Sequence, residues 1–583
     1  MWAYWVYLCS ALIVTRFRFD RWSKLHLPPC SHPRASCRCG SICGHGRVRD
    51  DIAGRRHGDR FFARAHHTTD ERYDCPSCRR IHLLATIGRK TGPLIIVIET
   101  IQGRRIHPRE RLLRDTFTPA ESLTFWAVMI TASLASVIAT PRSFWLLGFF
   151  LIVGVLTPAM VKVHEHTHPF IIDALWKRYW QLSAPAWLFC LQFIVGLLHN
   201  PLSSFEFNGQ LYQQIESTSA WQPTSVKDTN TWLSVLTYVS IYLLALNLYI
   251  IPKSRAFFER IFPPFCLIAV ILAVFGYLQK ALNLDSPIFT RGTGQADFFA
   301  FFPYDGHWAA FATLWAAVCV AMALLTTRYD DSGDFIDSSG PWYLTGATLL
   351  GLSGFAINAV WPSTVLLLSF SVLLLIVAIN FLTRTIDRHR NRIALFCGLG
   401  STVIFAGTVV RLYQNYPIAS EYGSLRLAAL KIFSEKPFFG WGFDSFAQLA
   451  PFYNADILLN ERHERAVSDV LQYLAELGIF GALLLPIAAC YLLIKYQHQI
   501  RNVLLSQHML IGCGAVILLA FCDSPLMSPA VFLSLLVVFF SALRWAKLSR
   551  TETDLVDARP QLVVPQWQRK VPFFAGEYKD ISK

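Results

Sequence analysis

The chain has 583 residues, of which 53% are hydrophobic and 16% charged, and its mean hydropathy is +0.38. A soluble chain of this length would carry many more charges, so the composition excludes an ordinary soluble protein. The net charge of +14 suggests a nucleic-acid partner, but residues 1–118 account for +12 of it. The rest of the chain carries only +2, so we predict no nucleic-acid partner.

Residues 1–118 form a basic segment rich in Cys and His, with neither helical nor strand periodicity. The spacing of Cys75-Pro-Ser-Cys78 and His82 is found among metal ligands, and a zinc site is one interpretation. A lone CxxC is a weak signal, however, and we expect no metal site. The preferred interpretation is a poorly ordered N-terminal extension, of which residues 1–84 are dispensable.

From residue 119 onward, apolar residues occur in blocks close to the ~20 that a helix needs to cross a hydrocarbon core about 30 Å thick. We predict an all-α, polytopic membrane protein with about twelve transmembrane helices and a large outer (periplasmic) loop that contains short helices. The expected spans are 123–140, 144–162, 182–198, 232–251, 262–281, 307–326, 342–360, 363–382, 393–410, 478–496, 508–524 and 527–544. The expected parts are the extension (1–118), transmembrane helices one to nine (119–410), the outer loop (411–477), helices ten to twelve (478–545) and a cytoplasmic tail (546–583).

Positive charge alternates from loop to loop along the membrane part. Clusters of Lys and Arg precede the first span and follow the second, fourth, eighth, tenth and twelfth, whereas the intervening loops hold few. Loops rich in Lys and Arg stay cytoplasmic. We therefore predict that both termini are cytoplasmic and that residues 411–470 face the outside.

The sequence of the outer loop predicts its local structure. Residues 423–433 show apolar residues at helical spacing and carry Arg426, so they predict a short amphipathic helix. Pro437 stops this helix, and Gly440-Trp441-Gly442 predicts a tight turn.

A second loop helix is predicted from Ala466 to Leu477, leading into the next span. Asp469, Gln472 and Glu476 lie at i, i+3 and i+7, so they share one polar face. These residues either take part in catalysis and substrate binding or only solvate a helix that enters the membrane. His307, which opens an earlier span, is either an interfacial polar group or a substrate contact.

At these residues the chain resembles the O-antigen ligase and O-antigen polymerase family of membrane glycosyltransferases. That family shows an Arg before a P-x-x-G-x-G-x-x-x-F turn, and then H-(N/S)-D-x-L-Q-x-x-x-E-x-G at the entry to a membrane helix. The matching segments are Arg426, Pro437-Phe438-Phe439-Gly440-Trp441-Gly442-Phe443-Asp444-Ser445-Phe446, Ser468-Asp469-Val470-Leu471-Gln472-Tyr473-Leu474-Ala475-Glu476-Leu477-Gly478 and Gly306-His307-Trp308-Ala309-Ala310. The resemblance covers roughly residues 120–545.

The resemblance implies transfer of a glycan from undecaprenyl diphosphate to a lipid or sugar acceptor, at the outer face of the inner membrane. It implies no metal and no cofactor; the partners are the undecaprenyl-diphosphate-linked glycan, the acceptor and membrane lipids. The guanidinium of Arg426 would meet the diphosphate through paired hydrogen bonds. Further substrate contacts would come from Arg411, His307, Gln472 and Glu476.

The chain departs from the family at Val467, where the family has His. Because Val cannot transfer a proton, the candidate base is His463, one helical turn earlier, or Asp469. If neither residue acts as the base, we expect the chain to be a divergent member of the family with altered or lost activity.

Three alternatives stay open. An O-antigen or exopolysaccharide polymerase and a protein glycosyltransferase share the resemblance. A polysaccharide or small-solute transporter belongs to another class and needs ionisable residues in the middle of its spans. The span centres are nearly free of them, which favours an enzyme.

Overall fold

The computed structural model describes residues 119–137, 153, 169–207, 210–215, 219–225, 229–253, 255–284, 298–329, 335–336, 338–384, 389–415, 422–453, 465–497 and 504–557. They all belong to one of the two units of the chain, Ile101–Lys583. The predicted extension 1–118, the predicted tail after residue 557 and the candidate base His463 lie outside the described residues.

The described residues are mostly helical, as predicted. Their elements in chain order are α5 (Pro119–Val137), α7 (Pro169–Gly196), β1 (Leu202–Phe207), β2 (Gln210–Ile215), α8 (Thr229–Ile250), α9 (Arg255–Ala281), α10 (Asp305–Tyr329), α11 (Gly340–Leu352), the 3-10 turn η2 (Ser353–Ala356), α12 (Val360–Arg384), α13 (Arg390–Asn415), α14 (Tyr422–Glu435), α15 (Phe446–Tyr453), α17 (Asp469–Gln497), α18 (Leu504–Cys522), the 3-10 turn η4 (Pro525–Met527) and α19 (Pro529–Asp557).

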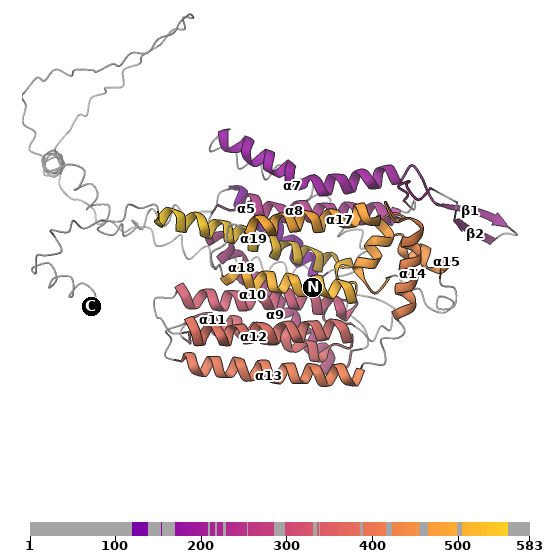
Figure 1. Cartoon of the computed structure of the whole chain (residues 1–583). Helices are drawn as coiled ribbons and strands as arrows, with labels where there is room; N and C mark the ends of the chain where they lie inside the picture. Colours follow the sequence, from indigo (N-terminus) through magenta and orange to yellow (C-terminus); the bar gives the residue numbers. More distant parts are fainter. Residues whose placement is uncertain are drawn as a thin grey trace, which may run out of the picture. The chain divides into compact units, whose positions relative to one another are not determined.

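The long helices lie side by side in one bundle (Figure 1). At its centre, α10 contacts α9, α11, α12, α18 and α19. At one edge α13 packs on α12, and at the opposite edge α7 packs on α8 and α17. The short helices α14 and α15 and the β1–β2 hairpin gather at one end of the bundle, which we call the loop end.

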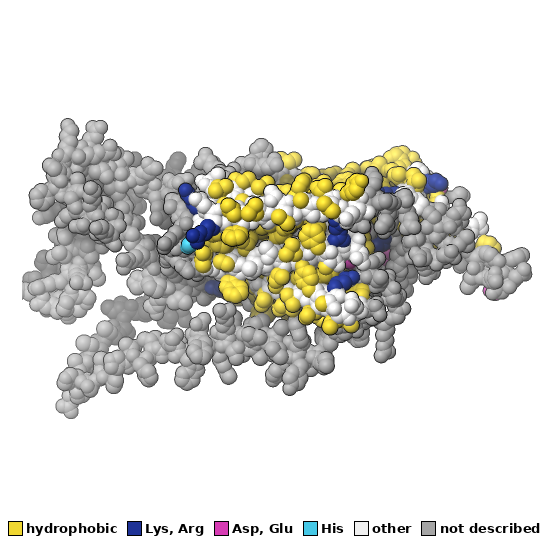
Figure 2. All heavy atoms as spheres, turned by 90° about the horizontal axis from the view of Figure 1, so that it is seen from below, with side chains coloured by type: hydrophobic (Ala, Val, Ile, Leu, Met, Phe, Trp, Pro, Cys, Tyr) yellow, Lys and Arg dark blue, Asp and Glu magenta, His cyan; other side chains and the backbone are white. Residues whose placement is uncertain are grey.

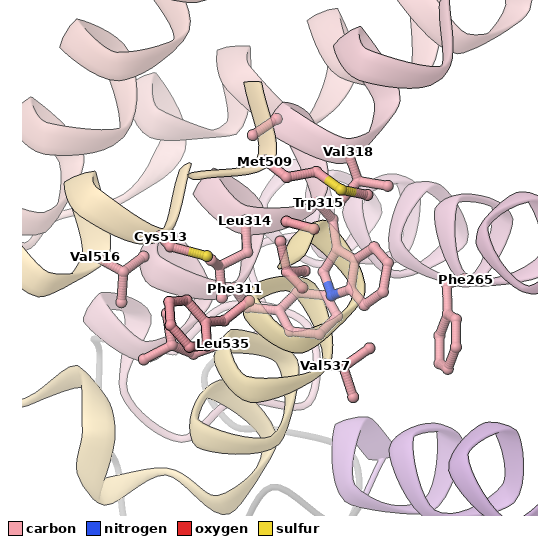
Figure 3. Packing of buried hydrophobic residues seen from close by; sticks show 14 of the residues in the cluster. Phe265, Phe311, Leu314, Trp315, Val318, Met509, Cys513, Val516, Leu535 and Val537 are labelled. Carbon is pink, nitrogen blue, oxygen red and sulfur yellow. The ribbon is translucent and has the colours of Figure 1, made fainter. Parts of the chain in front are cut away.

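The bundle interior is packed with large apolar side chains around α10 (Figure 3). Trp315 of α10 is 1% exposed and stacks on Phe265 of α9 with ring centroids 5.0 Å apart. Its indole N–H donates to the Ser534 hydroxyl of α19 over 3.3 Å. A buried Trp needs such a partner, because an unpaired indole N–H in an apolar interior costs free energy.

The outer helices present an apolar surface. Phe396 and Val403 of α13 are 72% and 70% exposed. Figure 2 shows a broad hydrophobic face with Lys and Arg gathered toward its two ends. An exposed apolar band with charges at its ends suits a hydrocarbon environment rather than water. Among the described residues, eight helices are long and apolar enough to cross a membrane, which indicates a membrane protein.

These eight helices coincide with eight of the twelve predicted spans, so the count of twelve is not confirmed. The predicted spans 123–140 and 182–198 overlap α5 and α7, which are helices but are not among the eight. Of 144–162, only Val153 is described.

The predicted span 342–360 needs correction, because α11 is only 13 residues long. The backbone leaves the α-helix at η2. Side chains form hydrogen bonds with the backbone N–H and carbonyl groups that this break leaves without helical partners. Asp305 accepts the backbone N–H groups of Asn358 and Ala359 at 2.7 and 3.1 Å. Arg411 donates to three carbonyl oxygens of the break, those of Gly354, Phe355 and Ile357.

One β-hairpin was not expected from the sequence. Strands β1 and β2 pair antiparallel, with Leu202 opposite Ile215 and Phe207 opposite Gln210. Between them the sequence reads Asn208-Gly209, a dipeptide typical of two-residue hairpin turns. The local signal was therefore present, although its strands are short and polar.

Candidate functional site

The amphipathic helix and the tight turn predicted within residues 411–477 are confirmed. Helix α14 buries Ala429 and Ile432 in a small apolar cluster with Trp441 and Phe446, apart from the main core. The Trp441 indole N–H donates to the Ile432 carbonyl at 2.9 Å, which closes the turn against the end of α14. The cluster therefore fixes the orientation of α14 and with it the position of Arg426.

The glycine turn docks on a kink of α17. Gly478 has φ 65° and ψ −174°, a conformation open essentially to Gly alone, and divides α17 into two parts. The groups freed by this kink bind the turn: Gly442 N–H donates to the Glu476 carbonyl at 2.8 Å, and Ile479 N–H donates to the Pro437 carbonyl at 2.8 Å. A Cβ on Gly440 would lie 2.4 Å from the Glu476 carbonyl, so no side chain fits between the two segments.

The predicted polar face of α17 is present and buried, but two of its residues hold the turn. The Glu476 carboxylate accepts the backbone N–H groups of Asp444 and Phe446 at 2.9 and 3.3 Å, and the Gln472 amide at 3.0 Å. The side-chain oxygen of Gln472, Oε1, accepts Ala466 N–H at 3.3 Å. We assign Gln472 and Glu476 a positioning role, since their polar atoms are engaged within the protein.

A buried lysine also joins the turn to the segment before α8. The Lys436 ammonium donates to the Thr224 hydroxyl at 3.0 Å and lies 4.2 Å from the centre of the Trp441 ring. Burial lowers the pKa of Lys436 from its ordinary value of 10.5 to about 8, although the charge of Glu435 opposes this shift.

Charged and polar side chains from three helices and two connections meet beside this docked turn. His307, at the start of α10, is fully buried, and its Nε2 lies 3.1 Å from an Arg465 guanidinium nitrogen and 3.2 Å from the Ser524 carbonyl. One nitrogen cannot serve both, so either Nε2–H donates to Ser524 or the bare Nε2 accepts from Arg465. The Nδ1 of His307 has no hydrogen-bond partner among the described residues.

Two carboxylates lie within electrostatic reach of Arg465. Asp523, just after α18, accepts the Tyr304 hydroxyl at 2.7 Å and the Ser524 backbone N–H at 2.8 Å. Asp469, at the start of α17, accepts Leu526 N–H at 2.6 Å through one oxygen. Its other oxygen has no partner within the described part of the chain.

Two arginines face these carboxylates. Arg426 of α14 donates to the Cys522 carbonyl at 2.7 Å, and its Nε is unpartnered among the described residues. Burial raises the pKa of Asp523, and the Tyr304 and Ser524 hydrogen bonds and the charges of Arg465 and Arg426 oppose that shift. Arg426, Arg465, His307, Asp469 and Asp523 therefore form one electrostatic cluster, which we call the loop-end cluster.

The structure thus brings together three of the seven predicted site residues: Arg426, Asp469 and His307. Arg411 lies within α13, which continues to Asn415, so it is not in the outer loop as predicted. Its guanidinium caps the break after α11.

The predicted link between His463 and the α17 face needs correction. Helix α17 begins at Asp469 rather than Ala466, since Val467 has a φ of 55° that a helix does not allow. The condition for that link, a helix that extends back from Ala466, is therefore not met, and His463 itself lies outside the described residues.

Sequence reasoning missed Arg465, Asp523 and Tyr304 as site residues. Arg465 lies in a run of charged residues that is typical of a solvated loop, and Asp523 lies in a short connection between two spans. One signal was available: Asp523 is a carboxylate between two apolar helices, and a carboxylate in such a place needs a buried partner.

The loop-end cluster combines the groups that an anionic leaving group and a nucleophilic hydroxyl require. Guanidinium groups bind phosphate oxygens through charge-assisted hydrogen bonds. A carboxylate or neutral imidazole can accept a proton. No protein-family model and no curated protein matches the chain.

Proposed function

We propose that the chain is a membrane glycosyltransferase that moves a glycan from undecaprenyl diphosphate to a lipid or sugar acceptor at the outer face of the inner membrane. One observation carries this proposal: two arginines, two aspartates and a histidine converge at one end of an apolar helix bundle. A lipid-linked diphosphate presents its charges at such an end, while its hydrocarbon stays beside the helices.

The proposed roles follow from the contacts. Arg426 and Arg465 stabilise the diphosphate as its bond to the glycan breaks and negative charge develops on the leaving oxygen. Asp469 takes the proton of the acceptor hydroxyl with its unpartnered oxygen, and the hydroxyl oxygen forms the new glycosidic bond. The products are the glycosylated acceptor and undecaprenyl diphosphate, and we propose neither metal nor cofactor.

A transporter is the alternative from another class, and the charge distribution argues against it. No Asp, Glu, Lys or Arg lies in the central eight residues of any of the eight described candidate spans. A transport pathway through the bundle would need ionisable groups at that depth. The charges gather at the ends, where an enzyme would meet a lipid-linked substrate. A polymerase uses the same chemistry with a growing glycan as acceptor.

The proposal includes an orientation, with the loop end outside and both termini cytoplasmic. A cysteine replacing Leu427, which is 60% exposed on α14, should react with an impermeant reagent in intact cells, in a chain without other Cys. A cysteine replacing the exposed Arg392, at the opposite end, should be protected. The reverse pattern would put the cluster on the cytoplasmic side.

The reaction itself is tested with purified protein in vesicles that contain an undecaprenyl-diphosphate-linked glycan and an acceptor. Free undecaprenyl diphosphate should appear, and Asp469→Asn should slow its release by about 10²- to 10⁴-fold, as expected for loss of a general base. Glu206→Gln, which neutralises an exposed carboxylate at the same end, is the matched control and should not change the rate.

The alternative base is tested in parallel with His463→Ala and Val467→His. Loss in His463→Ala with full activity in Asp469→Asn would move the base to His463. If Val467→His alone raises activity, the histidine of the family position is what this chain lacks. If the unmodified protein releases no undecaprenyl diphosphate, the proposed function is wrong.

A further inference from the structure

A second group of charged side chains lies at the other end of the bundle, far from the loop-end cluster. Helix α19 starts beside Asp469 and reaches Arg544 15 residues later, about 22 Å along a helix that rises 1.5 Å per residue. Helix α7 approaches the turn through Gln192, which donates to the Phe439 carbonyl at 2.9 Å, and carries Arg178 14 residues earlier. Lys495 lies in the last turn of α17.

We call Arg178, Lys495, Arg544 and Lys547 the basic-end cluster. Arg544 and Lys547 are three residues apart on α19 and so share one face of that helix. The charges of Arg178, Arg544 and Lys495 all act on the Lys547 ammonium, so three helices bring four like charges within electrostatic reach of one another. The Glu121 carboxylate acts on Arg544 and offsets part of this charge.

The contacts that hold the arginines leave much of their hydrogen-bonding capacity available. Arg178 donates to the Tyr249 hydroxyl at 2.9 Å, and its guanidinium lies over the same ring, 4.8 Å from the centre. Arg544 donates through Nε and one terminal nitrogen to the Pro252 carbonyl. A guanidinium has five N–H donors in a fixed fork, so each arginine keeps donors beyond these contacts with the described residues.

An anion that joined this group of cations would stabilise it. Like charges held together repel, and the repulsion is strongest where apolar helices displace water. Tyr249 and Pro252 hold the two arginines in place, so the chain bears their repulsion even without a ligand. A phosphate group between the helices would relieve it and accept the remaining donors.

We infer that the basic-end cluster binds the phosphate of an anionic phospholipid from the membrane leaflet at this end. The lipid source is favoured because an apolar surface continues directly from the cluster. On α17, Tyr491 and Ile487 lie four and eight residues before Lys495, so they share its face, and they are 57% and 62% exposed; the Lys495 ammonium lies 5.8 Å from the centre of the Tyr491 ring. These side chains provide an apolar surface on which acyl chains can pack beside the basic-end cluster, as in basic sites between membrane helices.

The test uses the full-length protein in detergent, with phosphatidylglycerol, cardiolipin or phosphatidylcholine added and retained lipid measured by native mass spectrometry. The unmodified protein should retain the two anionic lipids and not phosphatidylcholine. Lys495→Gln should weaken retention about fivefold and Arg178→Gln/Lys495→Gln about 25-fold, at about 1 kcal/mol for each charge near an anionic headgroup. Lys495 is exposed, so its variant is expected to fold even if the double variant does not.

The matched control is Arg390→Gln/Arg392→Gln, which removes two exposed charges from the start of α13 at the same end of the bundle. It should retain anionic lipid like the unmodified protein. Equal loss in this control, or equal retention of phosphatidylcholine, would show general attraction to a basic end and overturn the site. Displacement of the lipid by millimolar inorganic phosphate would show that the cluster binds free phosphate rather than a lipid headgroup.

Discussion

The assignment of Glu476 as a positioning residue predicts a large loss of stability when its carboxylate is removed. Glu476 is 1% exposed and accepts hydrogen bonds from Asp444 N–H, Phe446 N–H and the Gln472 amide. In Glu476→Ala, the two backbone donors lose their acceptor inside the protein. Each buried, unpaired donor costs about 1–3 kcal/mol, so we expect a loss of about 2–6 kcal/mol in the free energy of unfolding.

The size of the loss should depend on what replaces the carboxylate. Glu476→Gln keeps one acceptor oxygen but turns an NH₂ group toward a backbone N–H, so it should lose about half as much as Glu476→Ala. Glu206→Ala, which removes an exposed carboxylate from β1, is the control and should change stability by less than about 0.5 kcal/mol.

The assay is denaturant or thermal unfolding of the purified protein in detergent, together with donor turnover. If Glu476 positions the turn, the free energy of unfolding and the rate of donor turnover should both fall in Glu476→Ala. A variant with unchanged unfolding and a raised KM would show that Glu476 contacts substrate instead, and would refute the reasoning from its hydrogen bonds.

Three further predictions concern single groups near the site. Gly478→Ala should destabilise the fold by more than about 2 kcal/mol, because φ is 65° and the Cβ would lie 2.3 Å from a backbone carbonyl oxygen; Gly398→Ala, with open space around its Cβ, is the control in the same unfolding assay. Because burial lowers the pKa of Lys436 to about 8 from 10.5, the folded state binds fewer protons between these values, so Tm should rise with pH there and the rise should vanish in Lys436→Met. Tyr304→Phe removes a hydrogen bond that opposes the raised pKa of Asp523, so the pKa of Asp523 should rise further; infrared titration of the carboxyl group checks this, and a fall in its pKa would contradict the role of the Tyr304 hydrogen bond.

Local sequence signals predicted the short helix α14 and the glycine turn well. The apolar spacing before Pro437 predicted α14, and the glycines after it predicted the turn, because helix stops and tight turns depend on few neighbouring residues. The i, i+3, i+7 spacing likewise placed Asp469 and Glu476 on one face. It did not reveal that Glu476 binds the turn, since that depends on which backbone groups the turn presents.

Long-range packing set the limits of prediction elsewhere. Arg465 lies beside His307 and acts on Asp523 because α10 and α17 begin, and α18 ends, at the loop end, a relation that no local pattern encodes. An apolar run also predicted a full span at 342–360. The structure ends α11 early because Asp305 and Arg411, distant in sequence, satisfy the backbone groups of the break.

The most direct test of the proposed active site is donor turnover by variants of Arg426. Its loss removes a charge-assisted contact to the diphosphate, so Arg426→Ala should release undecaprenyl diphosphate about 30- to 1000-fold more slowly. Arg426→Lys keeps the charge and a donor for the Cys522 carbonyl but loses the planar fork, so it should recover only part of the rate. Arg392→Ala, at the opposite end, should match the unmodified protein. If Arg426→Ala reaches the membrane, folds and turns over donor at the unmodified rate, the loop-end cluster is not the active site.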